Sequence, residues 1–100
     1  MAVTKKVSAH EIGEALAEIV KHEPLVKELW VSTHPEIHVW LVVEPLDIDA
    51  QRQLYYLPDP VYERLPGAQF EFHILNPCNH NGDVHQALPT WAEQIPLRAN

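Results

Sequence analysis

Residues 35–45 read PEIHVWLVVEP, a stretch of alternating side chains between two prolines. Every odd position from 37 to 43 is aliphatic, whereas Glu36, His38 and Trp40 occupy even positions. Because successive side chains of a β-strand point to opposite faces, this pattern predicts a strand with one face on the core. The other face carries a carboxylate, an imidazole and an indole. It is predicted to be either a functional site or a surface covered by something else.

The residues before this stretch predict a helix and a first strand. Residues 28–34 alternate in the same way, and so short a connection requires the two strands to pair antiparallel. Apolar residues recur at helical spacing over residues 8–22, where Ser8 and Glu11 have the form of a capping box and Pro24 follows the end.

A broken helix is predicted after the second strand. Asp47 or Asp49 can cap this helix, and Pro58 interrupts it because proline has no backbone N–H to donate. Asp59 then has the position of a new N-cap, and the helix continues to Leu65.

Residues 68–75 alternate as a third strand, which the preceding helix predicts to be parallel to the second. We therefore expect one α+β domain over residues 1–100, with an αββαβ core at 8–75, a three-stranded mixed sheet and both helices on one face. Residues 76–100 lose periodicity and are predicted to wrap the domain as a tail, with one helical turn near Trp91. A fourth short strand from this tail is the alternative.

Composition excludes several classes of function. The net charge is −7, and residues 28–100 hold ten acids against three arginines, so the clustered cations that a nucleic-acid partner requires are missing. There is neither an apolar run of about 18 residues nor the apolar core of a signal peptide. Cys78 is the only cysteine, which fits a reducing compartment. We expect a cytoplasmic protein with no membrane partner.

Four side chains on the open sheet face are candidates for chemistry. Glu36 and His38 lie two residues apart on one predicted strand, and Glu71 and His73 repeat the pattern on a neighbouring one. Carboxylates and imidazoles are ligands for divalent transition metals and also serve as general acids and bases. The alternative is that all four are the ordinary solvent side of half-buried strands.

The order α-β-β-α-β resembles the polymerase-β-type nucleotidyltransferases in their minimal bacterial form. The resemblance covers residues 8–75, with IHVWLVVEP in the second strand and YERLPGAQFEFHIL leading into the third. Members of that family bind magnesium and nucleotide phosphates through an Asp-x-Asp pair and a third acid. The resemblance implies that Glu36 and His38 match the pair and that Glu71 matches the third acid.

Two positions of this chain depart from the family motifs. His38 stands where magnesium needs an oxygen ligand. Val31 replaces the glycine of a Gly-Ser turn whose amide must approach phosphate, although Ser32 is kept. The resemblance therefore implies a degenerate member that has lost nucleotidyl transfer. Minimal members pair with small helical partner proteins, a role that such a chain could keep.

The tryptophans favour a covered open face. Trp30 and Trp40 share that face by parity, and monomers seldom leave such an apolar patch bare. The cover could be the tail with Trp91, a second copy of the chain or a ligand. We expect a non-catalytic interaction module without a cofactor, which binds a second copy or a small protein partner through Trp30, Ser32, Trp40 and Trp91. The alternative is a metal-dependent hydrolase or nucleotidyltransferase-like enzyme, with a divalent ion held by Glu36, His38, Glu71 and His73.

Overall fold

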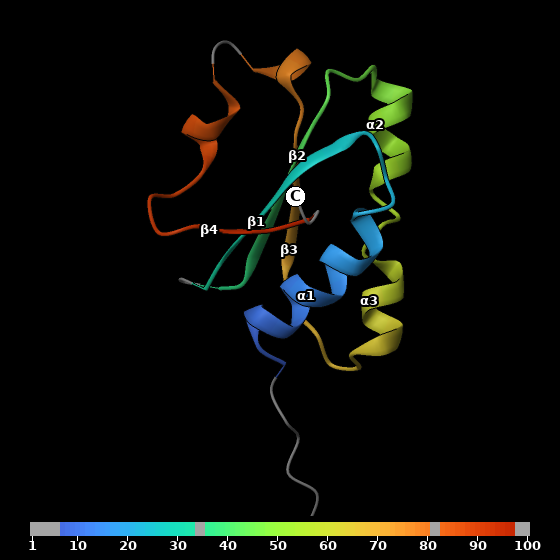
Figure 1. Ribbon diagram of the computed structural model, residues 1–100, viewed down its shortest axis with the longest axis vertical. Helices are drawn as coiled ribbons and strands as arrows, with labels where there is room; N and C mark the ends of the chain where they lie inside the picture. The colour runs from blue at the N-terminus through green and yellow to red at the C-terminus, as the bar shows by residue number, and fades with distance from the viewer. Residues whose placement is uncertain (1–6, 34–35, 81–82, 98–100) are drawn as a thin grey trace, which may run out of the picture.

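A sheet and a layer of helices make up the computed structural model, which describes residues 7–33, 36–80 and 83–97 (Figure 1). The helices of these residues are α1 (Ala9–Val20), α2 (Ile48–Leu54) and α3 (Asp59–Arg64), with 3₁₀ turns η1 (Pro77–Asn79) and η2 (Val84–Ala87). The strands are β1 (Val26–Ser32), β2 (His38–Val43), β3 (Glu71–Leu75) and β4 (Glu93–Ile95). None of these helices is long and apolar enough to cross a membrane.

The strands form one mixed sheet in the order β3-β2-β1-β4. β1 and β2 make an antiparallel hairpin in which Trp30 lies opposite Trp40. β3 is parallel to β2, and β4 is antiparallel to β1. This architecture confirms the predicted α+β class and the parallel second and third strands, and it shows that the tail supplies a fourth strand.

Local sequence explains where the helices begin and end. Ser8 Oγ accepts a hydrogen bond from the Glu11 N–H at 3.1 Å, and Asp47 Oδ1 accepts one from the Ala50 N–H at 2.8 Å, so these two side chains are the N-caps of α1 and α2. Pro58 separates α2 from α3, as predicted. The N-cap of α3 is Pro58 itself, so the prediction that the following aspartate caps this helix was wrong by one residue.

The main hydrophobic core lies between the sheet and the helices. α1 contributes Ile12 and Leu16, and the hairpin contributes Leu29 and Leu41, all with no exposed surface. Complete burial of one such side chain stabilises the fold by about 1.5–3 kcal/mol. The odd positions of residues 37–43 therefore have the role that the alternation predicted.

Asn76 fixes the end of β3 to the loop that follows β2. Its side chain is fully buried, with Oδ1 accepting from the N–H groups of Leu46 and Cys78, both at 3.1 Å. Its Nδ2 donates to the Leu46 carbonyl and to Gln51 Oε1, both at 2.8 Å. One amide side chain thus joins three segments of the chain.

The tail covers part of the open sheet face. After β3 it crosses the side of the sheet opposite α2 and α3, and it returns as β4 (Figure 1). Val84 of the tail belongs to a second apolar cluster that includes Trp40, and Leu88 and Ala92 pack against that cluster. The predicted helical turn near Trp91 was wrong, because the helical turns of the tail are η1 and η2. Trp91 is 57% exposed, so it is not the anchor of the tail.

Candidate functional site

The four predicted metal ligands separate into two pairs. The register places His38 beside Glu71 and Trp40 beside His73. Three of the predicted ligands, His38, Glu71 and His73, therefore share the open face with Trp40, as parity predicted. Glu36 precedes β2 instead of belonging to it. The two imidazoles contact each other, and the two carboxylates line a cavity at the amino ends of β2 and β3.

The imidazoles of His38 and His73 meet end to end. His38 Nδ1 and His73 Nε2 are 2.9 Å apart, and the ring planes differ by 8°. The centroid distance of 5.2 Å exceeds the N···N distance by 2.3 Å (5.2 − 2.9), which is about two ring radii. The rings therefore lie nearly in one plane and share an in-line N–H···N hydrogen bond. Both rings lie nearly parallel to the indole of Trp40, with centroids 5.5 and 5.4 Å away.

The His73 imidazole is harder to protonate than an exposed one, because its pKa is lowered. Burial lowers the pKa of His73, His38 lowers it further, and only the carboxylate of Glu71 acts in the opposite direction. If both rings were charged, two N–H groups would face each other across 2.9 Å. The hydrogen bond therefore favours one donor ring and one acceptor ring.

The residues of the alternative metal site do not surround a common point. Among the described residues, no group of three or more histidine, cysteine, aspartate or glutamate side chains is placed to hold a metal ion. The nitrogens of His38 and His73 that face each other are occupied by their mutual hydrogen bond. The geometry therefore does not fit a divalent ion ligated by all four predicted side chains.

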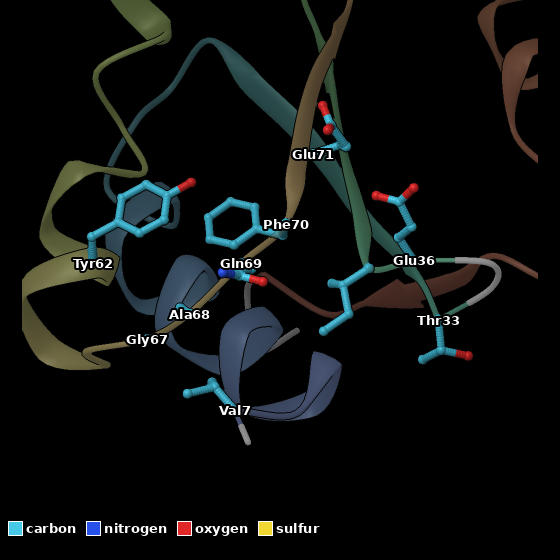
Figure 2. A pocket seen from close by; sticks show the side chains of 10 residues that line it. Val7, Thr33, Glu36, Tyr62, Gly67, Ala68, Gln69, Phe70 and Glu71 are labelled. Carbon is cyan, nitrogen blue, oxygen red and sulfur yellow. The ribbon is translucent and has the colours of Figure 1, made fainter. Parts of the chain in front are cut away.

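The carboxylates of Glu36 and Glu71 line a cavity of about 650 Å³ (Figure 2). The rings of Tyr62 and Phe70 form its opposite side, stacked with centroids 5.1 Å apart and planes 7° from parallel. Burial raises the pKa of the Tyr62 hydroxyl, and the charges of Asp59 and Glu71 raise it further. Thr33 and Gln69 also line the cavity, so polar and apolar side chains share its surface and both charged groups that line it are carboxylates.

Ser32 lies on the same face but is enclosed. It is 3% exposed, and its Oγ has no hydrogen-bond partner among the residues that the structure describes. The register places it opposite His38. In this conformation Ser32 offers no surface to a partner, although the sequence predicted it as a contact residue.

Polar contacts hold the tail over Trp30. They join Glu28 and Trp30 of β1 to Asp83 and His85 of the tail, a group called the latch below. Glu28 Oε1 accepts from Trp30 Nε1 and lies within hydrogen-bond distance of His85 Nε2, both at 2.8 Å. His85 Nδ1 contacts Asp83 Oδ1, so one imidazole lies between two carboxylates. Hydrogen bonds to Glu28 and Asp83 raise the pKa of His85.

The latch was not predicted from sequence, although part of its signal was present. Glu28 and Trp30 share a face by parity. The Asp83-x-His85 spacing fits a turn in which Asp83 Oδ1 accepts from the His85 N–H at 2.9 Å. The contact between β1 and a residue 57 positions later depends on tail conformation, for which periodicity gives no information.

The three predicted tryptophans differ in exposure. Trp40 is 8% exposed, Trp30 is partly buried beneath the tail, and Trp91 is exposed. The tail, which was one of the three predicted covers, accounts for the burial of Trp30 and Trp40. Trp91 is the one predicted contact residue that stays well exposed, and its role in a contact remains a prediction.

Another surface open to contact is the outer edge of β3. β3 is the last strand of the sheet, and Glu71 N–H donates to the Ile37 carbonyl of β2 at 2.9 Å. Because backbone groups alternate along a strand, the N–H and C=O of Phe72 point away from β2. Exposed tyrosines flank this edge, since Tyr62 stacks on Phe70 and Tyr55 packs edge-on against Phe72.

No protein-family model, curated protein or solved structure matches the chain.

Proposed function

We propose that this chain is a small, non-catalytic interaction module that forms a homodimer by pairing the edges of two β3 strands. The observation that carries the proposal is the outward-facing backbone of Phe72, flanked by partly exposed aromatic rings. An unpaired strand edge is a template for another strand, and aromatic residues are enriched in protein interfaces. The occupant is a second copy because this edge is complementary to itself.

The self-complementarity follows from one register. If the two-fold axis passes beside Phe72, the Phe72 residues of the two copies lie opposite each other. The outward backbone groups of Phe70 in one copy then face those of Ile74 in the other copy. Glu71 then lies directly opposite His73 of the partner subunit. A register centred on Glu71 would instead oppose two carboxylates, which is unfavourable.

The imidazole pair supports this register. His73 Nε2 contacts His38 Nδ1, and no described residue forms a hydrogen bond with His73 Nδ1. With His38 donating to His73 Nε2, the Nδ1–H of His73 is free to donate to a carboxylate. Glu71 of the partner subunit supplies that carboxylate twice in the symmetric dimer.

The lack of catalysis is also part of the proposal. Val31 and His38 stand at positions where the resemblance to nucleotidyltransferases requires glycine and an acid. A degenerate member that kept only partner binding agrees with the enclosed Ser32 and with the paired imidazoles. We place the protein in the cytoplasm, where its free cysteine, Cys78, would stay reduced.

Sedimentation equilibrium of charge-exchanged variants tests the dimer. The wild type is expected to approach twice its chain mass of 11.5 kDa as concentration rises. Glu71→Lys should raise the dimer dissociation constant about tenfold or more, since two cross-strand pairs are lost. Adding His73→Glu should restore association by opposing the new lysine with a carboxylate.

Glu36→Lys is the matched control, because it makes the same change of charge outside β3. Equal weakening by Glu36→Lys and Glu71→Lys would indicate a general charge effect and would refute the proposed register. A wild-type mass that stays at one chain up to the solubility limit would refute the dimer itself.

A further inference from the structure

We infer that His38 and His73 form a two-coordinate binding site for a soft monovalent metal ion of the copper(I) kind, held in line between His38 Nδ1 and His73 Nε2. Imidazole nitrogen is a ligand for copper, and copper(I) and silver(I) form stable complexes with two ligands in a straight line. The site lies within one chain and is independent of the proposed dimer, which uses the other ring nitrogen of His73.

The geometry of the two rings carries the inference. The facing nitrogens are 2.9 Å apart on the line that joins the ring centroids, and the ring planes differ by 8°. Their lone-pair directions therefore point at one another, as a linear N–metal–N unit requires. Metal–imidazole bonds are about 2 Å long, so the nitrogens would move apart by about 1 Å to admit the ion. Both side chains are half-buried, so neither ring is locked in the core.

The exchange of the hydrogen bond for an ion releases no net proton. When His38 donates to His73, its proton is on Nδ1. For His38 Nδ1 to bind the ion, that proton moves to Nε2, and both rings stay neutral, which is the form of imidazole that binds metals. The carboxylate of Glu71, beside His38 in the register, has the charge opposite to that of the ion.

The surroundings favour a soft ion with few ligands. Trp40 stacks on both rings, with centroids 5.5 and 5.4 Å away, so an ion between the rings lies no farther than 5.5 Å from the indole centroid. That distance is within the range of about 6 Å for cation–π attraction. Zinc takes four ligands in a tetrahedron, and among the described residues no third histidine, cysteine, aspartate or glutamate joins these two to form a larger metal-binding group.

A buried hydroxyl without a partner lies on the same face. Ser32 is opposite His38 in the hairpin, on the side of β2 away from His73, and is 3% exposed. Its Oγ has no hydrogen-bond partner in the part of the chain that the structure describes. Such atoms are rare in folded proteins. A histidine that binds a metal usually donates its second ring N–H to an acceptor, and Ser32 places an acceptor beside the His38 tautomer that binding requires.

Titration of the Cys78→Ser chain with silver(I), followed by NMR of the histidine ring nitrogens, tests the inference. The substitution removes an exposed thiol that would itself bind silver. We expect one silver ion to bind saturably and to shift His38 Nδ1 and His73 Nε2, and copper(I) added without oxygen to shift the same two nitrogens. Zinc(II) should bind these nitrogens at least tenfold more weakly, because they supply only two of its four ligands.

Single variants connect the binding to the pair. His38→Gln and His73→Gln, each in the Cys78→Ser chain, should weaken silver binding tenfold or more, because one nitrogen remains of two. His10→Gln is the matched control, since His10 is an exposed α1 imidazole beside Glu14, and amide spectra without metal check that each variant is folded. An equal loss in this control, zinc binding as tight as silver binding, or no saturable shift at the two nitrogens would overturn the inference. None of these readouts depends on chain mass, so a failure here is distinct from a failure of the dimer.

Discussion

Replacing Asn76 by alanine should destabilise the fold more than any change to an exposed polar residue. The buried side chain makes four hydrogen bonds, three of them to backbone groups of Leu46 and Cys78. Alanine leaves the Leu46 N–H and C=O without these partners, and Leu46 is only 8% exposed, so water can replace them only in part. A buried polar group that loses its partner costs about 1–3 kcal/mol.

The expected loss in unfolding free energy is therefore about 3 kcal/mol, allowing for partial rescue by water. A domain of this size has about 5–15 kcal/mol in total, so the variant should still fold, with a Tm lower by about 12–24 °C. Urea denaturation followed by tryptophan fluorescence measures the change. Asn79→Ala is the control, because this exposed side chain makes one hydrogen bond, to Gln51 Oε1 at 2.9 Å, and should cost under about 0.5 kcal/mol. A loss below about 1 kcal/mol for Asn76→Ala would refute the view that this residue joins the three segments.

Three further predictions concern the latch, the covered face and the turn at Gly67. Because carboxylates raise the pKa of His85, its stabilisation is complete below its unfolded value of about 6.5 and is lost as pH rises through the raised value. Wild-type stability relative to His85→Gln should therefore fall in parallel urea titrations as the pH rises above about 6.5; a difference that does not change with pH would contradict the latch. Trp40→Ala should cost about 3 kcal/mol because the indole is packed under the tail, whereas Tyr56→Ala, at 70% exposure, should cost under about 0.5 kcal/mol. Gly67→Ala should cost about 1 kcal/mol through its positive φ alone, since no atom lies within 4 Å of the added methyl group; a neutral effect in thermal unfolding would show that the turn relaxes.

Much of the fold was predictable because one physical rule governs strands. Alternation over residues 37–43 identified the core face, and parity placed His38, Glu71 and His73 together on the opposite face. Parity does not fix where a strand begins. Glu36 was therefore assigned to the strand, although it lies just before β2 and faces the cavity.

The tail was less predictable because its contacts are not periodic. The burial of Val84 and the exposure of Trp91 depend on how two 3₁₀ turns orient the chain, and those turns are fixed by side-chain caps such as Asp83. Hydrophobicity alone selected Trp91 as the anchor. The end-to-end contact of His38 and His73 also depends on exact register, which alternation does not provide.

The location of the contact surface was also only partly predictable from sequence. Two tryptophans on one face correctly indicated a cover, and the cover of Trp30 and Trp40 is the chain's own tail. The edge of β3 became a candidate only once the strand order was known, since sequence does not show which strand is outermost.

Hydrogen exchange at the Phe72 amide tests the proposed dimer most directly. This N–H points away from β2, whereas the amides of Glu71 and His73 point toward it and should be protected at any concentration. Pairing of two β3 edges predicts that Phe72 protection rises with protein concentration, and that Glu71→Lys abolishes this rise. Rapid exchange at Phe72 that is independent of concentration would contradict pairing through this edge.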